Sequence, residues 1–366
     1  MKPHGMSIRS LLLLVAATTA CNPLQNYFEP IEDAQTWEKA EKSPVPPYSG
    51  QLKVMDWNIK FGGGRIDFFF DCFGDRSVMS TAEVESNLDG LISKINQADP
   101  DILFMQEVDI ASKRSADIDM IRYILDRTSL NYAVYASQWR AEYIPSNGLG
   151  AMDSGNVLMS RFPMSDAKRV ALAPWTDQSE MHAQYYLKRN MLRAKTEVPG
   201  FGRLTVITIH AEAYSQDGTK KKHIDAFKDE LDRAAAAGEP FLAGGDLNAL
   251  PPFTVKTKGF PDSVCKDEFV ADDYSAETEW LTPLYDAYDH ALSIEDYKAD
   301  NERWFTHTVD GRGWWNRCID HLFTNGRFVA GSGLVHQSIA RGGMETMPLS
   351  DHAPVTATLD LTAWQR

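Results

Sequence analysis

The chain contains many short apolar runs of strand length, and only some of them are separated by helical patterns. This density of strands predicts two sheets packed face to face, with helices on the outside. Apolar residues recur at helical spacing over 84–95, 118–125 and 224–231. The predicted strands are Leu52–Ile59, Ile102–Val108, Tyr132–Ala136, Gly155–Ser160, Met191–Val198, Leu204–His210, Phe241–Ala243, Cys318–Phe323 and Val355–Leu361. We expect one folded domain over residues 51–362, with a long loop over 251–283.

The first twenty residues are typical of an export signal. Lys2 and Arg9 precede an apolar run, Leu11–Ala17, that is too short to span a bilayer as a helix. Small residues and then Cys21 follow, which resembles the bacterial lipoprotein signal, in which that cysteine is lipidated and becomes the first residue. This predicts an outer-membrane or cell-surface lipoprotein, with residues 21–50 as a Pro-rich tether. The alternative is ordinary signal cleavage nearby, which would give a periplasmic or secreted protein.

The charge balance restricts the class of partner. Lys+Arg 37 and Asp+Glu 51 give a net charge of −14. An acidic chain is unsuited to coating DNA without regard to sequence, because that task needs a basic face. A hydrolase that holds one phosphate through a metal ion and a few donors is not excluded. We expect a monomer.

Three cysteines follow Cys21, and an odd number in an exported protein leaves at least one thiol unpaired. A disulfide between Cys72 and Cys265 is one alternative. Cys318 adjoins an apolar strand, so we expect it to be a buried small hydrophobic residue.

Polar side chains lie at the ends of the apolar strands, where each would stand at the rim of a sheet. These residues are Asn58, Glu107, His210, Asp246, Asn248, Asp320, Asp351 and His352. One strand-end Asp or Asn alone is usually a turn or cap residue. The set is more informative, because carboxylate and amide oxygens suit Mg²⁺ or Mn²⁺ and an Asp–His pair suits acid/base chemistry.

Five motifs then occur in the order seen in the endonuclease/exonuclease/phosphatase superfamily. They are Asp56–Lys60, Pro100–Val108, Gly244–Asn248, Cys318–Leu322 and Ser350–Val355. The sequence resembles that superfamily from Leu52 to Leu361. That superfamily contains deoxyribonuclease-I-like nucleases, abasic-site endonucleases, neutral sphingomyelinases and inositol polyphosphate 5-phosphatases. The resemblance implies an α/β (α+β) fold, a four-layer α-β-β-α sandwich of the deoxyribonuclease-I-like type, with the site at one rim of the paired sheets.

The resemblance also implies phosphoester hydrolysis with Mg²⁺ or Mn²⁺ as the cofactor. Glu107 is then the principal metal ligand, with Asn58 and Asp351 nearby. All three offer hard oxygen donors, and the sequence has no Cys or His cluster of the zinc type, so zinc is not expected.

Catalytic roles follow from the same resemblance. Asp246 and Asn248 would orient the nucleophilic water and the phosphate. Asp320 would pair with His352, and His210 would contact the phosphate or the leaving group. From sequence alone, His352 can either take a proton from the water or donate one to an oxygen.

The chain departs from the family pattern at two positions. Lys60 stands where some members carry an acidic residue, which leaves Asn58 as the metal ligand expected from this strand. His321 replaces a common tyrosine, and strand alternation places it on the face opposite Asp320.

Three other features have more than one interpretation. The adjacent Trp314 and Trp315 in a Gly-flanked loop could stack on a base, enter a lipid interface or pack beneath the loop. Lys220–Lys222 are expected to be a solvated turn, with contact to a phosphate as the alternative. Arg189 and Arg193 are expected to form surface ion pairs, with contact to the substrate phosphate as the alternative.

These observations support two classes of function. The first is an exported phosphodiesterase, acting on nucleic acid as an endonuclease does, or alternatively on a phospholipid headgroup as a sphingomyelinase does. The second is a non-catalytic surface-binding lipoprotein on the same scaffold. The complete polar set argues against the second, because a binding module has no need of Asp246, Asn248, Asp320 and His352 together.

Overall fold

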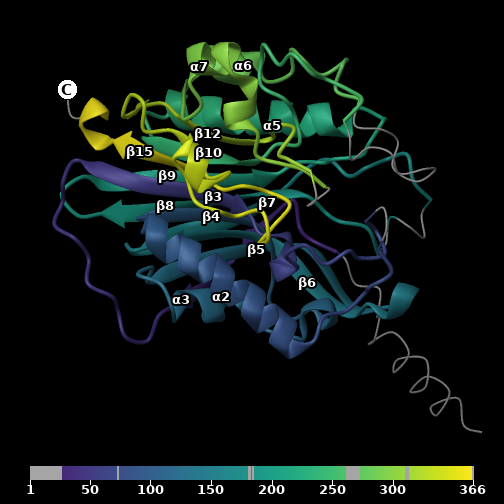
Figure 1. Cartoon of the computed structure of the whole chain (residues 1–366). Coiled ribbons are helices and arrows are strands. Elements are labelled where there is room, and N and C mark those ends of the chain that lie inside the picture. Colours follow the sequence, from purple (N-terminus) through teal and green to yellow (C-terminus); the bar gives the residue numbers. More distant parts are fainter. Residues whose placement is uncertain are drawn as a thin grey trace, which may run out of the picture.

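The computed structural model describes residues 27–364, apart from 72–73, 180–182, 184, 261–272 and 310–312. Two sheets pack face to face, and helices cover both outer faces (Figure 1). This arrangement confirms the predicted four-layer sandwich. Within the described residues, no helix is long and apolar enough to cross a membrane. The predicted signal peptide, Cys21 and both cysteines of the alternative disulfide lie outside the described residues.

One sheet has seven strands among the described residues, in the order β1-β7-β8-β9-β10-β12-β11. The strands are β1 (Ile31–Asp33), β7 (Met164–Ala171), β8 (Asn190–Val198), β9 (Gly202–His210), β10 (Phe241–Asp246), β12 (Asp320–Thr324) and β11 (Asp289–His290). The central pair β9 and β10 is parallel, whereas β12 runs antiparallel to β10.

The other sheet has eight strands among the described residues, in the order β13-β15-β3-β4-β6-β5-β2, with β14 paired to β15. The strands are β13 (Arg327–Phe328), β14 (Leu334–Val335), β15 (Val355–Asp360), β3 (Gln51–Asn58), β4 (Ile102–Asp109), β6 (Gly150–Ser160), β5 (Tyr132–Ile144) and β2 (Gln35–Glu38). The pair β3 and β4 is parallel, and β15 runs antiparallel to β3.

The helices form the two outer layers. Helices α2 (Thr81–Ala98) and α3 (Met120–Leu125) cover the eight-stranded sheet, and α5 (Thr219–Ala236), α6 (Thr282–Ala287) and α7 (Ile294–Ala299) lie on the other side (Figure 1). Helix α2 begins at Ser80, whose side chain accepts from the backbone N–H of Glu83 while the Glu83 carboxylate accepts from that of Ser80. This reciprocal cap fixes the start of the helix.

Strand β3 shows how the sequence pattern brings the site to the rim. Leu52 and Val54 belong to the core between the sheets, whereas Met55 and Trp57 pack toward α2 and α3. Strand alternation therefore places Asp56 and Asn58 on the inner face, at the end of the strand. The carboxyl ends of the two parallel pairs and the amino ends of β12 and β15 meet at this one rim.

The segment predicted as a tether contributes to the fold over residues 31–38. Strand β1 pairs with β7, and β2 pairs with β5, so the two strands extend both sheets at their edges. Trp37 on β2 donates from Nε1 to Asp119 Oδ2 at 2.9 Å and packs edge-on against Tyr135. The prediction that the folded part begins at residue 51 is therefore wrong.

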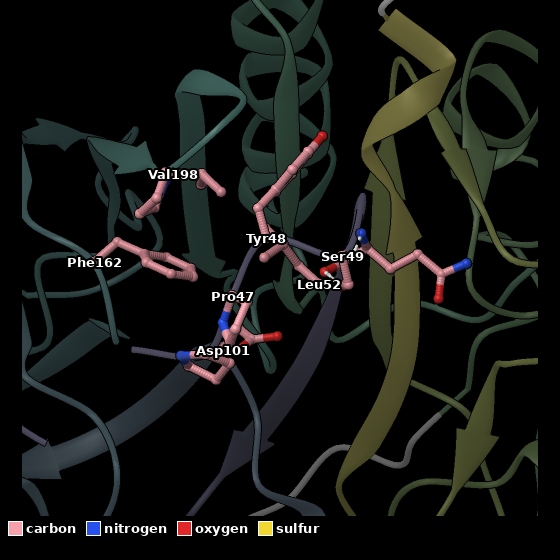
Figure 2. A pocket seen from close by; sticks show the side chains of 10 residues that line it. Pro47, Tyr48, Ser49, Leu52, Asp101, Phe162 and Val198 are labelled. Carbon is pink, nitrogen blue, oxygen red and sulfur yellow. Dashed lines mark hydrogen bonds between the residues drawn. The ribbon is translucent and has the colours of Figure 1, made fainter. Parts of the chain in front are cut away.

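The Pro-rich residues that follow lie along the opposite rim. A small pocket there is lined by residues that include Pro47, Tyr48, Leu52 and Asp101 (Figure 2). Leu52 is the second residue of β3 and Asp101 precedes β4, so this pocket is at the end of the sandwich away from the polar strand ends.

Candidate active site

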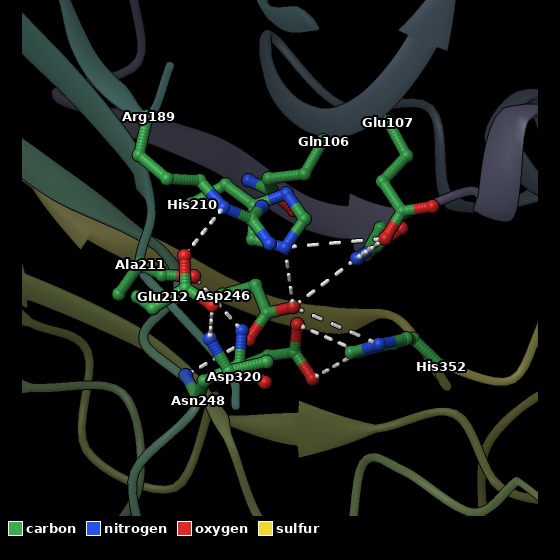
Figure 3. Close-up of polar contacts among 12 residues, drawn as sticks. Gln106, Glu107, Arg189, His210, Ala211, Glu212, Asp246, Asn248, Asp320 and His352 are labelled. Atoms are coloured by element: carbon green, nitrogen blue, oxygen red, sulfur yellow. Dashed lines mark hydrogen bonds and ion pairs between the residues drawn. The ribbon is translucent and has the colours of Figure 1, made fainter. Parts of the chain in front are cut away.

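The polar residues predicted at the strand ends come together at one rim of the sandwich (Figure 3). Asn58 ends β3, His210 ends β9 and Asp246 ends β10, while Asp320 begins β12 directly opposite Asp246. His352 lies three residues before β15, which is antiparallel to β3. The pairing of the strands, rather than any local motif, creates the cluster.

Glu107 reaches the site through an irregularity in β4. The register with β6 shifts between Met105 and Val108, and Glu107 has a φ of 57°. A left-handed conformation at a glutamate inside a strand costs conformational energy and is typical of functional sites. The bulge turns Glu107 toward the rim, and its side chain remains 28% exposed.

Asn58 lies between two carboxylates. Its Nδ2 donates to Glu107 Oε1 and to Asp246 Oδ2, both at 3.1 Å, while its Oδ1 accepts from the backbone N–H of Lys60. The amide therefore presents its nitrogen, not its oxygen, to the carboxylates. To bind a metal ion through oxygen, Asn58 would have to rotate its amide and leave the Lys60 N–H without that acceptor.

Asp320 and His352 form a buried dyad. Nδ1 of His352 lies 2.9 Å from Asp320 Oδ2 and 3.1 Å from Oδ1, so the ring donates to the carboxylate. The backbone around His352 is also fixed, because its carbonyl accepts from Trp57 Nε1 and its N–H donates to Ser350 Oγ. Burial alone would lower the pKa of His352, but the charges of Asp320 and Asp246 raise it to about 10.

Asp246 is the central carboxylate of the site. Its Oδ1 accepts from the Asn248 N–H at 2.9 Å, and its Oδ2 lies 3.7 Å from His352 Nε2 and 3.4 Å from His210 Nε2. Burial raises the pKa of Asp246 to about 7, although His352 opposes the shift. Asn248 adopts a φ of 51° and donates from Nδ2 to the Ala211 carbonyl, which holds the turn that follows β10.

His210 is held as a neutral ring. Burial, followed by the charge of Arg189, lowers its pKa well below the ordinary range. Its Nδ1 lies 3.3 Å from the side-chain nitrogen of Gln138 on β5, which donates to it. The other nitrogen, Nε2, then carries the proton and faces Asp246 and Glu107.

Glu107 and Asp351 are two neighbouring carboxylates that could hold a divalent cation. Burial, followed by the negative charge of Asp351, raises the pKa of Glu107. Burial disfavours the charged form of Asp351 as well, but Lys60 and then His352 lower its pKa. Two carboxylates that repel each other at a partly open rim fit a hard cation such as Mg²⁺, which would neutralise both.

The structure shows the contacts of Lys60 and His321, the two residues that depart from the family pattern. Lys60 is buried and its Nζ lies 3.0 Å from Asp71 Oδ2, close enough to Asp351 to affect its charge. His321 lies on the other face of β12, where Nε2 bonds the Ala249 carbonyl and Nδ1 meets the Tyr285 hydroxyl. It is a structural residue, as strand alternation predicts.

The structure shows the outcome for the other residues considered in the sequence, some as expected and some not. Arg189 is buried beside His210, 3.8 Å from Glu212, and Arg193 forms the expected ion pairs with Glu230 and Glu239. Lys220 is buried and bonds Glu277, so the predicted solvated turn is wrong at that position.

Trp315 is buried, whereas Trp314 is 41% exposed. Cys318 is a buried free thiol, as predicted.

Sequence reasoning missed two polar residues that adjoin the site. Gln138 lies on β5, far from any motif, and contacts His210. His307 forms an isolated backbone bridge with His352, and their rings lie edge-on with centroids 4.5 Å apart. The sequence around Gln138 and His307 contains no motif that indicates a site, because only strand pairing brings these residues to the rim.

Known proteins provide an independent comparison. A family model described as the endonuclease/exonuclease/phosphatase family matches residues 57–352. The structure is similar to an endonuclease/exonuclease/phosphatase from Beutenbergia cavernae DSM 12333, with 20% identity, a TM-score of 0.55 and coverage of 85% of this chain and 71% of that one. It is also similar to the human Nocturnin catalytic domain with bound sulfate anion, with 15% identity, a TM-score of 0.50 and coverage of 89% and 97%. No curated protein sequence matches.

Proposed function

The chain belongs to the endonuclease/exonuclease/phosphatase family, whose members hydrolyse phosphoester bonds, and we propose that it is a phosphodiesterase that uses Mg²⁺ or Mn²⁺ and cleaves nucleic acid as an endonuclease does. The observation that carries this proposal is the cluster of Asp246 with the Asp320–His352 dyad at the rim that also holds Glu107. This arrangement combines a proton acceptor, a proton donor and a cation site within a few ångströms.

The two central groups differ in their pKa, so that His352 is protonated near neutral pH whereas Asp246 is partly ionised. With a pKa of about 10, His352 is protonated and donates to a phosphate oxygen instead of taking a proton. Asp246, with a pKa of about 7, is the group that can take the proton of the attacking water. The raised pKa of His352 therefore supports the donor role among the two roles that the sequence left open.

The residues around Asp246 and His352 would bind the metal ion, contact the substrate and orient Asp246. Glu107 and Asp351 would hold the divalent cation, which when bound supplies positive charge to the phosphoryl oxygens. The Nε2–H of His210, which lies 3.4 Å from Asp246 Oδ2, would donate to the phosphate or to the leaving oxygen. Asn248 fixes the Asp246 carboxylate through its backbone N–H.

A phospholipid headgroup is the second candidate substrate. Trp314 is 41% exposed, and Arg341 lies over its ring at 5.7 Å. Ile339, two residues before Arg341, is 76% exposed. Exposed Trp and Ile side chains beside an Arg are suited to a lipid interface as well as to a nucleobase.

We also propose that the protein is exported and held at the outer membrane or cell surface by a lipidated Cys21, and that it acts as a monomer. The support is the sequence before Cys21: two basic residues, a short apolar run and small residues.

The test is hydrolysis of bis(p-nitrophenyl) phosphate by the purified protein, with Mg²⁺, with Mn²⁺ and with excess chelator. Activity that needs the metal ion and is lost in the Glu107→Gln variant is expected. The same preparations are then assayed on DNA, RNA, sphingomyelin and inositol phosphates. Cleavage of sphingomyelin without cleavage of DNA or RNA would replace the nucleic-acid proposal by the lipid one. Absence of hydrolysis of every substrate would leave the non-catalytic binding role.

A further inference from the structure

His307 belongs to the rim of the site, although it is in none of the family motifs. Its backbone forms an antiparallel bridge with His352, which places both side chains on the same face. A ring nitrogen of His307 lies within 4.8 Å of a carboxylate oxygen of Asp351 and of a ring nitrogen of His352. The residue as a whole is half-buried.

The protonation of His307 is set by its neighbour Arg317. Nε of Arg317 donates to His307 Nδ1 at 3.1 Å, and a guanidinium can only donate. Nδ1 therefore carries no proton, and Nε2 of the neutral ring carries it. Burial, followed by the charge of His352, lowers the pKa of His307 well below the ordinary range, which keeps the ring neutral. His307 thus offers one fixed N–H donor.

This tautomer argues against a metal ion at His307, Asp351 and His352, although their donor atoms are close together. A histidine that binds a metal through one nitrogen normally donates the proton on the other nitrogen to an acceptor. In His307 that other nitrogen accepts from Arg317 instead. The cations Arg317, Arg65 and Lys60 also lie near enough to the ring to affect its charge, and they would oppose a second cation.

The same surroundings favour an anion. The rim carries the carboxylates of Glu107, Asp246 and Asp351, so a phosphate needs donors as well as a metal ion to approach it. We propose that the Nε2–H of His307 donates to a non-bridging oxygen of the substrate phosphoryl group, beside His352, and that Arg317 is the positioning residue that fixes this donor. This inference rests on the proposed phosphodiesterase function and adds a catalytic residue to it.

Two variants at position 307 separate a donor from a merely structural ring. His307→Gln keeps an amide N–H near the position of Nε2, whereas His307→Leu keeps much of the volume without a donor. We expect His307→Leu to lower kcat/KM for bis(p-nitrophenyl) phosphate by about 10²-fold, as removal of one oxyanion donor does. His307→Gln should stay within about tenfold of the wild type. His290→Leu, a histidine on β11, is the matched control and should have little effect.

Binding of inorganic phosphate provides a readout that does not depend on turnover. In the presence of Mg²⁺, calorimetry should show weaker phosphate binding for His307→Leu and nearly unchanged binding for His307→Gln and His290→Leu. The binding measurement can be made even if the enzyme cleaves none of the diesters tested. Failure of the proposed function and failure of this inference are therefore distinguishable. Circular dichroism establishes that each variant is folded. If His307→Leu does not fold, His307→Asn, whose amide is too short to reach the same point, takes its place.

The inference is overturned if His307→Leu, or His307→Asn in its place, matches the wild type in both measurements. It is also overturned if His307→Gln lowers kcat/KM and phosphate binding as much as His307→Leu does. A loss that is the same with and without the N–H donor would show that the role of the ring is structural. A fixed donor further predicts that the pH dependence of kcat/KM keeps its shape in His307→Gln. A shifted profile would mean that His307 exchanges a proton during the reaction.

Discussion

The imidazolium of His352 depends on the carboxylate of Asp320, and the two should behave as one unit. Removing a general acid or base costs on the order of 10²–10⁴ in rate. We expect His352→Ala to lower kcat by at least that factor. Asp320→Asn should lose nearly as much, because the 2.9 Å bond that holds the ring would be gone. The double variant should be little worse than the worse single variant.

The measurement is single-substrate kinetics on the three variants, each shown by circular dichroism to be folded. Losses that multiply in the double variant would mean that Asp320 and His352 act independently, and the role assigned to the dyad would then be wrong.

The raised pKa of His352 also predicts how stability depends on pH in the metal-free protein. Its folded pKa is about 10, above the ordinary histidine value of 6.5. A raised histidine pKa stabilises the fold fully below the unfolded pKa, and this contribution is lost as the pH rises to 10. His352→Gln should therefore destabilise the protein more at pH 6 than at pH 10.

Urea denaturation in excess chelator, at several pH values between 6 and 10, measures this difference between wild type and variant. A difference that grows with pH would contradict a protonated His352 in the folded state.

Glu107 should control metal binding and turnover together. The Glu107→Gln variant keeps the shape of the side chain but removes the charge that would neutralise the cation. We expect Mn²⁺ affinity, measured by calorimetry, and kcat to fall together, while excess chelator abolishes the activity of the wild type. Glu85→Gln, an exposed position on α2, removes the same charge elsewhere and should change neither. Full activity of the wild type in chelator would refute the metal assignment.

At the scale of one element, α2 depends on its first turn. The Ser80 side chain accepts from the Glu83 N–H, and Ala cannot replace that bond. Ser80→Ala should lower the free energy of unfolding by about 1 kcal/mol. Ser86→Ala, at an exposed position within the same helix, should be neutral or slightly stabilising, because Ala is the better helix former. Equal effects of the two substitutions in urea denaturation would show that the cap contributes nothing.

The elements also show what could be predicted from the sequence. The buried strands β3, β4, β9 and β10 have long apolar runs, so both their positions and their polar ends are visible in the sequence. Strands β1 and β2 are only three and four residues long and mostly polar, and edge strands of this kind carry no periodic apolar signal. His307 and Gln138 reach the site only through pairing between distant segments, which no spacing in the chain reveals.

For the whole molecule, the N-terminal strands place a limit on how far the enzyme can stand from a membrane. Strand β1 begins at Ile31, so nine residues, 22–30, separate it from Cys21. A chain of this length spans at most about 30 Å when fully extended. If Cys21 is lipidated, the edge strand β1 therefore lies close to the lipid surface, whereas the predicted tether to residue 50 would have allowed a much longer reach.

We expect mass spectrometry of the membrane fraction to find a diacylglyceryl group on Cys21 as the first residue of the mature protein. Cys21→Ser should release the protein from the membrane, because the acyl chains proposed to anchor it at Cys21 would be lost. The released variant should keep full activity on bis(p-nitrophenyl) phosphate, since the catalytic rim does not include the edge strand β1. A mature form in the soluble fraction with a free N-terminus at another residue would refute the lipidation.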